Sequence, residues 1–491
     1  MKRRTKPESL ELDHEACYRA MRQRDARFDG RLFIGVKTTG IYCRPVCPAR
    51  TPFSKNVIFF PTAAAAQEAG FRPCLRCRPE TAPDLGAWRG TSNTVSRGLS
   101  LIEHGALDDA NVDALAGRLG VGERQLRRLF RQHLGASPVA VAQTRRVLLA
   151  KQLIHETPLP MTEVAFAAGF GSIRRFNETF RQLFDRAPRE LRGATSPEFS
   201  VATLGELVLL LRYHPPYDWD AMIEFLRRRA IAGVELVEER HYARTLRLGG
   251  LTGTVAVEPA TGNALRASVR FPRLSALPVI IARLRRVFDL GADPLAIAAH
   301  LAKDPTLAPL VKARPGLRVP GAWDGFELAI RAVLGQQITV AAAARLAGRM
   351  VAAYGEPLPS PSGPLTHVFP RPEIVAAADL ASLGMPRSRA AALSAVAAAA
   401  VADPHVFDGN CALDDAVKRL CTIRGVGEWT AQYIALRQLR EPDAFPAADL
   451  GLLRAIAGRE GRKHSSSELL DRANAWRPWR AYAAQHLWAA A

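Results

Sequence analysis

Two stretches of the sequence decide how its first part folds: GIYCRPVC at residues 40–47 and GFRPCLRCRP at residues 70–79. Each stretch holds a close pair of cysteines, which are Cys43 with Cys47 and Cys74 with Cys77. Two close pairs in one short region have the spacing of a four-thiolate zinc site. We therefore predict that these four sulfurs bind one Zn²⁺ per chain. Residue types alone leave open whether any sulfur reacts, because most four-cysteine zinc sites only stabilise a fold.

The composition of the chain predicts a large, basic protein with several domains. Its 491 residues exceed a single hydrophobic core, so three or more domains are expected. The formal net charge of +20 favours a polyanionic partner, with nucleic acid as the first candidate and a membrane surface as the alternative. No apolar run reaches the roughly 20 residues that span a bilayer, and the basic start, Met1 to Arg4, lacks the apolar core of a signal peptide. We expect a cytoplasmic protein without a membrane partner.

Changes in composition along the chain indicate where its blocks begin and end. Residues 81–92 and 193–197 are predicted to be linkers because they contain clustered small residues and prolines. After the second linker, alternating apolar residues predict strands at 234–237, 245–248 and 254–257, and a helix is expected at 219–229. The pattern from residue 278 onward is helical, apart from a proline-rich loop expected at 356–372. The other three cysteines are expected to be small hydrophobes in a reducing compartment: Cys17, Cys411 and Cys421.

An internal repeat marks the middle of the chain. The sequence LFRQHLGASP at residues 129–138 recurs as TFRQLFDRAP at residues 179–188. In each copy a short helix, a glycine-containing turn and a second helix follow one another, over residues 112–133 and 162–184. That order is typical of a helix-turn-helix, with Asn111 and Thr162 expected to cap the first helices. A long helix from Pro138 to about His155 joins the two copies.

The second helix of each copy presents arginines, which can hold phosphates or read guanine edges in a major groove. A generic helical hairpin with a solvated basic face is the alternative, but two copies favour DNA binding. The arrangement resembles the AraC-type DNA-binding domain over residues 90–193, in which paired units contact successive major grooves. The predicted DNA-binding residues of this block are Arg124, Arg127, Arg128, Arg174 and Arg175.

The residues around the cysteines favour a reactive zinc site over a purely structural one. FIGVKTTGIYCRPVCPAR at 33–50 and AGFRPCLRCRP at 69–79, with Asp29-Gly30 upstream, resemble the N-terminal domain of the Ada adaptive-response regulators over residues 1–81. The resemblance implies that Cys43 irreversibly accepts a methyl group from a DNA methylphosphotriester, and that Arg50 contacts DNA. Methylation would remove one negative charge from the cluster and strengthen DNA binding, so repair would act as a switch. Further phosphate candidates are Arg44, Arg72, Arg76 and Arg78.

Three stretches of the last block indicate a second activity. IRGVGEWTA at 423–431 places Gly425 and Gly427 in a hairpin between two expected helices, where backbone N–H groups can bind a phosphate. Together with GFELAIRAVLGQQI at 325–338 and AFPAADLG at 444–451, it resembles the AlkA-type 3-methyladenine DNA glycosylase II. The resemblance covers residue 199 to the C terminus, with an α+β subdomain at 199–284 and a helix-hairpin-helix domain at 285–491.

That resemblance assigns roles to individual residues. Asp449 would be catalytic, either stabilising an oxocarbenium ion or positioning a water, and Trp429 with Tyr433 would form an electron-rich pocket for a flipped cationic base. The structural alternative is that Asp449 caps the helix from Leu450 and Trp429 belongs to the core. The position often held by a second acid is Ala448. A wedge residue is expected among residues 336–338, which are Gln336, Gln337 and Ile338.

Two absences in the sequence narrow the predicted chemistry. Bifunctional relatives carry a Schiff-base lysine at the position of Trp429, so we predict a monofunctional enzyme that leaves an abasic site. No cysteine follows Cys421, so no iron–sulfur cluster is expected. The chain also lacks the P-C-H-R motif of an O6-alkylguanine transferase, and repair of O6-methylguanine is not expected.

The predicted fold class is multidomain: a small α+β zinc domain, an all-α paired helix-turn-helix domain, and an α+β subdomain followed by an all-α helix-hairpin-helix domain. The implied function is alkylation repair combined with transcription regulation in the bacterial nucleoid. The expected partners are alkylated and promoter DNA, with RNA polymerase as a further candidate. One alternative is a regulator whose last block has lost catalysis, and another is a structural zinc protein whose cysteines never react.

Overall fold

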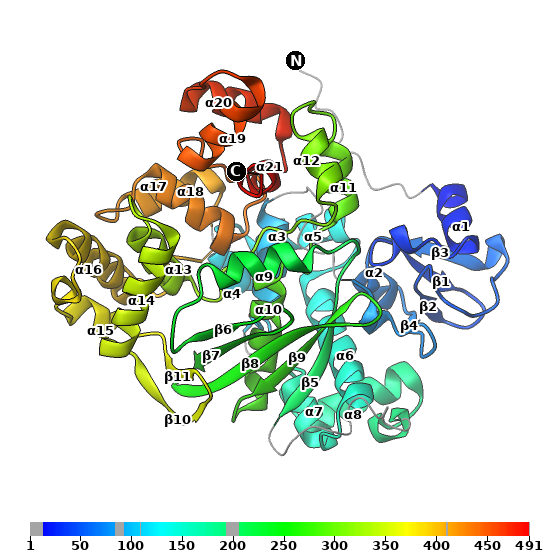
Figure 1. Ribbon diagram of the computed structural model, residues 1–491. Helices are drawn as coiled ribbons and strands as arrows, with labels where there is room; N and C mark the ends of the chain where they lie inside the picture. Colours follow the sequence, from blue (N-terminus) through cyan, green and yellow to red (C-terminus); the bar gives the residue numbers. More distant parts are fainter. Residues whose placement is uncertain (1–12, 84–92, 109, 193–205, 409–410, 491) are drawn as a thin grey trace. The chain divides into compact units, whose positions relative to one another are not determined.

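The computed structural model describes residues 13–83, 93–108, 110–192, 206–408 and 411–490 (Figure 1). They form two compact units, the first made of residues 1–201 with 274–280 and the second of residues 202–273 with 281–491. Mixed sheets and helical blocks confirm the multidomain fold class. Residues 84–92 and 193–197 of the predicted linkers lie outside the described residues, and the four-part division of the chain stays a prediction.

The first unit begins with a small sheet that carries the cysteines. Its strands are β1 (Phe33–Val36), β2 (Ile41–Cys43), β3 (Val57–Phe60) and β4 (Arg72–Pro73), in the order β3-β1-β2-β4. The strand β1 pairs antiparallel with β2 and β3, whereas β4 runs parallel to β2. The helices are α1 (His14–Arg22) and α2 (Ala63–Glu68), with short 3₁₀ turns η1 (Ala26–Phe28), η2 (Ser54–Asn56) and η3 (Pro79–Thr81). Because β2 and β4 are neighbours, the two cysteine pairs that follow them come together.

The rest of the first unit is helical: α3 (Asn93–Glu103), α4 (Val112–Arg118), α5 (Glu123–Leu134), α6 (Pro138–Glu156), α7 (Met161–Ala167), α8 (Ile173–Phe184) and η5 (Pro188–Leu191). Asn111 caps α4 as predicted, since its side chain accepts a hydrogen bond from Ala114 N at 2.9 Å. The expected Thr162 cap was wrong. Helix α7 begins at Met161, two residues earlier than a Thr162 cap implies, so Pro160 holds the N-cap position and Thr162 lies inside the first turn.

The second unit begins with a five-stranded antiparallel sheet in the order β5-β9-β8-β7-β6. Its strands are β5 (Leu207–Arg212), β6 (Glu235–Val237), β7 (Tyr242–Leu248), β8 (Leu251–Ala260) and β9 (Ala264–Arg270), and α9 (Trp219–Arg227) precedes β6. The three predicted strands and the predicted helix are confirmed, although the first strand begins one residue later than predicted, at Glu235, and the helix ends two residues earlier, at Arg227. Residues 274–287 then form η7 (Leu274–Ala276) and α10 (Leu277–Val287).

The remaining chain is mostly helical, as predicted. Its elements are α11 (Pro294–Leu301), α12 (Ala308–Ala313), α13 (Gly325–Leu334), α14 (Val340–Tyr354), α15 (Pro372–Ala377), η8 (Leu380–Leu383), α16 (Arg387–Ala402), α17 (Leu413–Cys421), α18 (Glu428–Ile434), the π-helical turn η9 (Ala435–Leu439), α19 (Leu450–Glu460), α20 (Ser466–Ala473), η10 (Asn474–Trp476) and α21 (Arg480–Trp488). Among the described residues, no helix has the length and apolar character needed to cross a bilayer.

The predicted proline-rich loop was wrong in part, because residues 356–372 contain a two-stranded ribbon. Strand β10 (Glu356–Ser362) pairs antiparallel with β11 (Leu365–Val368), and the register shifts between Pro357 and Ser362. A proline lacks an N–H and interrupts a ladder within a sheet, but a ribbon's outer edge and a register shift both tolerate it. Gly363, with φ of +56°, makes the turn between the strands.

Candidate metal centre and candidate active-site cleft

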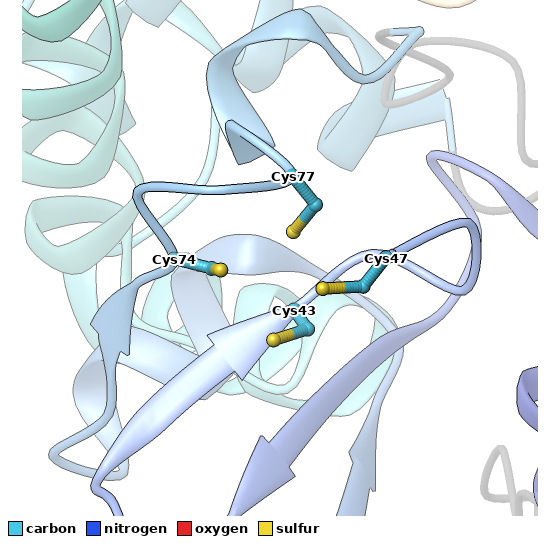
Figure 2. A group of neighbouring side chains, drawn as sticks. All are labelled: Cys43, Cys47, Cys74 and Cys77. Atoms are coloured by element: carbon cyan, nitrogen blue, oxygen red, sulfur yellow. The ribbon is translucent and has the colours of Figure 1, made fainter. Parts of the chain in front are cut away.

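The four predicted cysteines point toward one another at the end of the small sheet (Figure 2). Their sulfurs all lie within 4.8 Å of one another. A tetrahedral Zn²⁺ with bonds of about 2.3 Å separates its sulfurs by about 3.8 Å, so the site fits zinc. Cys43 closes β2 and Cys74 follows β4, while Cys47 and Cys77 lie in the loops beyond.

The environments of the four sulfurs differ. Sγ of Cys77 accepts a hydrogen bond from Arg44 N at 3.3 Å, and Sγ of Cys74 accepts one from Arg76 N at 3.4 Å. The backbone N–H of Ala49 faces the sulfur of Cys47. Over the described part of the chain, no backbone N–H binds the sulfur of Cys43. Cys74 and Cys77 are buried, whereas Cys43 and Cys47 are half-buried.

Two of the predicted phosphate contacts are engaged inside the protein instead. Arg44 forms an ion pair with Asp29 and also donates to the carbonyl oxygen of Cys77 at 3.1 Å. Arg78 forms ion pairs with Glu80 and Glu156. These side chains stabilise the metal-binding loops. Of the other predicted contacts, Arg50 and Arg76 are exposed and Arg72 is half-buried.

A buried ion pair ties the metal-binding region to the long helix α6. Lys151, which is fully buried on α6, donates to Glu80 at 2.8 Å and to the carbonyl oxygen of Cys74 at 3.3 Å. At the other end of the same contact, Ser137 N and Oγ both donate to Glu68 at 2.9 Å. A predicted metal ligand is therefore connected directly to the helix that joins the two helix-turn-helix copies.

The arginines predicted to bind DNA are all exposed on the second helix of each copy. On α5 they are Arg124, Arg127 and Arg128, and on α8 they are Arg174 and Arg175. Arg127 pairs with Glu123 on its own helix, and Arg174 pairs with Glu178 in the same way. The side chains of Arg124 and Arg175 form no hydrogen bond or ion pair with any residue that the structure describes. Their guanidinium groups are free to bind an external anion.

The second unit contains a cleft of about 1140 Å³, and one helix face supplies three of the residues that line it. Trp429, Tyr433 and Arg437 follow one another at intervals of four residues along α18 and η9. The rings of Trp429 and Tyr433 are stacked, with centroids 5.5 Å apart. An interval of four residues exceeds the α-helical turn of about 3.6 residues, so successive side chains would rotate slowly around the helix axis. The wider π-helical turn compensates for this rotation, and Arg437 therefore lies on the same face.

Asp449 is fixed by three N–H donors at the Trp429 end of this face. Its Oδ2 accepts from Nε1 of Trp429 at 2.9 Å, and its Oδ1 accepts from Nε1 of Trp488 at 2.8 Å. Oδ1 also accepts from Leu452 N at 3.0 Å, which makes Asp449 the N-cap of α19. The structural alternative is therefore partly right, because Asp449 does cap this helix. It also lines the cleft together with the half-buried Trp429.

Sequence reasoning missed two residues of this cleft. Trp488 lies on α21, far from the recognised motifs, and only the contact with Asp449 shows its place. Arg437 is 2% exposed and lies over the rings of Phe225, Tyr433 and Trp488, at 4.3, 5.3 and 5.4 Å. The spacing of four residues from Tyr433 was a signal that could have identified Arg437.

The hairpin before α18 leaves backbone donors open. Gly425 has φ of +86°, and a Cβ there would lie 2.3 Å from that of Ala392, so both the backbone and the packing require glycine. Within the described ranges, the N–H groups of Gly425 and Gly427 form no hydrogen bond. Gln336 donates to the carbonyl oxygen of Gly425 and to Thr430 Oγ1, both at 2.9 Å. In contrast, Gln337 is exposed and has φ of +59°.

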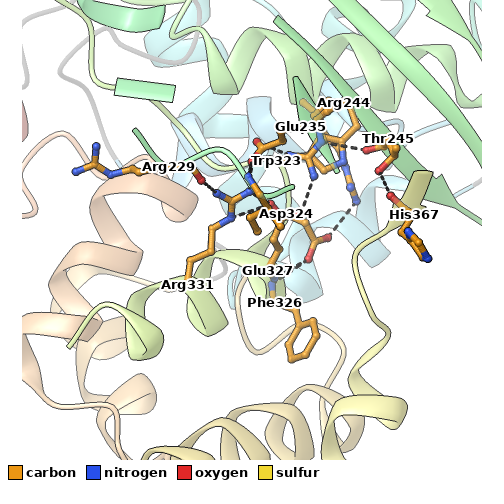
Figure 3. A network of polar contacts seen from close by, with 12 residues as sticks. Arg229, Glu235, Arg244, Thr245, Trp323, Asp324, Phe326, Glu327, Arg331 and His367 are labelled. Atoms are coloured by element: carbon orange, nitrogen blue, oxygen red, sulfur yellow. Dashed lines mark hydrogen bonds and ion pairs between the residues drawn. The ribbon is translucent and has the colours of Figure 1, made fainter. Parts of the chain in front are cut away.

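A buried network of charges forms another part of the cleft wall (Figure 3). Arg244 donates to Glu327 at 2.7 Å, and Arg331 bridges Glu327 and Glu235 at 2.7 and 2.5 Å. Arg331 also donates to the carbonyl oxygen of Arg229 at 2.7 Å. Burial alone would raise the pKa of Glu327, but the two guanidinium groups outweigh burial and lower it to about 2. The negative charges of Glu235 and Glu327 are therefore neutralised by arginines of the protein itself.

Comparison with known families accounts for nearly the whole chain. Residues 16–80 match the metal binding domain of Ada, and residues 115–194 match a helix-turn-helix domain. Residues 208–324 match the AlkA N-terminal domain, and residues 330–480 match the HhH-GPD superfamily of base excision DNA repair proteins. The fold and the two sites thus define a protein of the Ada and AlkA classes combined in one chain.

The relatives show which combination this is. A probable bifunctional transcriptional activator/DNA repair enzyme AlkA from Mycobacterium tuberculosis is 44% identical over 478 residues, covering 97% of this chain and 96% of that protein. The chain therefore belongs to the family of bifunctional transcriptional activator/DNA repair AlkA proteins. DNA-3-methyladenine glycosylase 2 of Escherichia coli is 37% identical over 284 residues, covering 57% of this chain and 95% of the relative. In fold, 57% of the chain is similar to 96% of the 3-methyladenine DNA glycosylase of Archaeoglobus fulgidus, with a TM-score of 0.51 and 20% identity.

Proposed function

We propose that this chain repairs alkylated DNA and regulates transcription, with base excision in the second unit and methyl transfer in the first. The observation that carries the first activity is the carboxylate of Asp449, held by two indole N–H groups in an aromatic-walled cleft. Family membership supports the combination with a transcription regulator.

The cleft is suited to hydrolysis of the glycosidic bond of a cationic base. Trp429 and Tyr433 present π faces to a base flipped out of the duplex, and such faces attract a cation such as 3-methyladenine in DNA. When the C1′–N bond breaks, its electron pair leaves with the base and positive charge moves to the sugar. Asp449 stabilises that charge. Because Oδ1 already accepts two hydrogen bonds, Oδ2 carries the lone pair that faces the sugar or holds the attacking water.

Three further features support an enzyme that removes the base without cutting the strand. None of the described residues lining the cleft is a lysine, and Trp429 has no amine that could form a Schiff base with the sugar. The open N–H groups of Gly425 and Gly427 are suited to a backbone phosphate. Gln337 is the best candidate for the wedge residue. It is exposed and held in a left-handed backbone conformation, which is costly for a non-glycine residue, whereas Gln336 is bound to the hairpin.

In the first unit, we assign the methyl acceptor to Cys43. Cys47, Cys74 and Cys77 would complete the zinc site, and bound zinc would keep all four sulfurs as thiolates at neutral pH. Amide hydrogen bonds to the other three sulfurs withdraw electron density, which leaves Cys43 the most nucleophilic. Its sulfur attacks the methyl carbon of a methylphosphotriester, the C–O bond breaks, and the phosphodiester leaves as an anion. Arg50 and the arginines of α5 and α8 would bind DNA phosphates or bases.

One experiment tests both activities. Full-length zinc-loaded protein is incubated with duplex DNA that has been treated with a methylating agent and carries both 3-methyladenine and methylphosphotriesters. We expect free 3-methyladenine, strand breaks only after alkali, and a mass increase of one methyl group on the peptide containing Cys43. Absence of base release would overturn the glycosylase, and borohydride trapping of a protein–DNA adduct would overturn the monofunctional mechanism. A methyl group on another cysteine, or none, would overturn the assignment of Cys43.

A further inference from the structure

Arg437 is a buried cation with no anionic partner. Its guanidinium donates to the carbonyl of Pro320 at 3.0 Å and to Oε1 of Gln485 at 3.2 Å, and it is also hydrogen-bonded to the phenol of Tyr433. Its Nε is buried without an acceptor, and in the part of the chain that the structure describes it forms no ion pair. Its charged neighbours, Arg229 and Arg440, are themselves cations. The buried Arg244 and Arg331, in contrast, are each paired with carboxylates (Figure 3).

Such an arrangement costs stability, because a buried charge normally needs a partner. Burial lowers the pKa of Arg437 to about 10, and the group therefore stays protonated at neutral pH. Burial alone would raise the pKa of Tyr433, but Arg437 and Arg229 outweigh it and lower that pKa. Both guanidinium groups thus act on the ring that forms the middle of the cleft wall.

The position of this charge relative to Asp449 gives it a function. Asp449 is bonded to Trp429, and Arg437 lies two helical steps further along the same face, beyond Tyr433. At a rise of about 1.5 Å per residue, the backbone positions 429 and 437 are roughly 12 Å apart. The two charges are linked more closely, because the Arg437 guanidinium lies 5.4 Å from the ring of Trp488, which donates to Asp449. A base against Trp429 and Tyr433, with its sugar at Asp449, would therefore extend from the anion toward the cation.

We propose that Arg437, assisted by Arg229, drives positive charge off the leaving base and toward the sugar. This inference rests on the proposed glycosylase. During cleavage the electron pair of the C1′–N bond passes to the base, so a cationic base becomes neutral and a neutral base becomes an anion. In both cases the charge of the base falls by one, which a nearby cation favours. The same cation repels a cationic base before cleavage and leaves the binding of a neutral base unaffected.

The test compares two duplexes, one with cationic N7-methylguanine and one with neutral hypoxanthine, in single-turnover reactions of the full-length protein. In Arg437→Gln we expect the excision rate at saturating enzyme to fall on the order of tenfold for both bases, as for loss of one unit charge near the reacting group. The Kd of the N7-methylguanine duplex should stay equal or fall, and that of the hypoxanthine duplex should not change. Arg437→Lys, which keeps the charge, should retain most of the rate.

A second variant covers the case in which Arg437→Gln fails to fold. Arg229 is half-buried, lies 3.8 Å from the Phe225 ring, donates to the carbonyl oxygen of Phe225 and is hydrogen-bonded to Tyr433. Because it is less buried than Arg437, Arg229→Gln should fold and show the same split between rate and Kd. The matched control is Arg270→Gln. Arg270 is exposed, pairs with Glu206 and does not line the cleft.

The outcomes separate this inference from the function on which it rests. Unchanged rates in Arg229→Gln, or equal losses in Arg437→Gln and Arg437→Lys, would show a purely structural role and overturn the inference alone. A wild-type protein that releases neither of these bases, and no 3-methyladenine from methylated DNA, would overturn the glycosylase and the inference together.

Discussion

At the scale of single residues, Asp449 combines a structural and a proposed chemical role in one carboxylate. Capping α19 fixes one oxygen, and the indole of Trp488 fixes the same oxygen from a second direction. The indole of Trp429 then sets the rotation of the group through the other oxygen. A carboxylate held in this way needs no reorganisation when charge develops on the sugar, which is the condition for strong electrostatic stabilisation.

Two substitutions test this site: the first removes the charge together with the Trp429 hydrogen bond, because an Asn Nδ2 would face the indole N–H, and the second removes one orienting N–H alone. Asp449→Asn keeps the helix cap but removes the negative charge, so base excision should fall about 10²-fold or more with little change in DNA affinity. Trp488→Phe keeps an aromatic ring but removes one of the orienting N–H groups, and a smaller loss, on the order of tenfold, is expected. Single-turnover release of 3-methyladenine measures both effects. Trp476→Phe is the matched control, because it removes an indole hydrogen bond to the carboxylate of Asp304, and neither residue lines the cleft. Full activity of Asp449→Asn would contradict the assignment of Asp449.

Residues inside recognisable motifs could be predicted, and residues that only the fold brings to the cleft could not. The four cysteines follow from their spacing, whereas the role predicted for Asp449 follows from the resemblance of residues 444–451 to a glycosylase segment. Trp488 has no such stretch, and its role depends on α21 meeting α19. Arg437 lies between these cases, because helical spacing from Tyr433 indicated its face but not that it would be buried without a carboxylate.

At the scale of elements, local patterns predicted the helices, and a long-range contact accounts for the ribbon that was missed. The helix-turn-helix elements follow from apolar periodicity and glycine turns, which act within a few residues. The ribbon of β10 and β11 was not predicted because its prolines are typical of a loop. Its pairing is fixed in part by a bridge between Leu365 and Gly233, which no local pattern records.

Helix α6 also holds an interaction that the sequence did not reveal. Lys151→Met would leave Glu80 buried with only the partly exposed Arg78 as its partner, so we expect the first unit to lose about 3–5 kcal/mol of unfolding free energy. Urea denaturation of the zinc-loaded protein, followed through the transition of the first unit, measures the loss. The double variant Lys151→Met with Glu80→Leu should recover much of it, since no buried charge is left unpaired.

A surface pair serves as the control for this prediction. Arg174→Met removes an exposed pair with Glu178 on α8 and should change the stability by less than about 0.5 kcal/mol. Equal stability of Lys151→Met and the wild type would mean that the buried pair contributes nothing to holding α6 against the metal-binding region.

At the scale of the whole molecule, the metal centre and the helix-turn-helix copies belong to one compact unit. A change at the cysteines therefore occurs in a body that also carries the arginines of α5 and α8. Four thiolates on one Zn²⁺ give a net charge of −2, and methylation of Cys43 reduces it to −1. No rearrangement is needed for this change to affect DNA, because a less negative protein binds a polyanion more tightly.

The methylated protein should accordingly bind DNA more tightly than the unmethylated protein, on the order of tenfold at low salt and less as salt screens the charge. The measurement is a titration at fixed salt of full-length protein, before and after complete methylation, on a duplex selected from random sequence by the unmethylated form. Because this duplex is selected for binding to the unmethylated protein, a higher affinity of the methylated protein cannot result from the selection. Cys43→Ala taken through the same methylation treatment should show no gain. Arg124→Gln with Arg175→Gln should weaken both forms by the same factor, because the DNA contacts proposed for these arginines do not depend on the state of Cys43. Equal affinity of the two wild-type forms at every salt concentration would show that methylation repairs the backbone without acting as a switch.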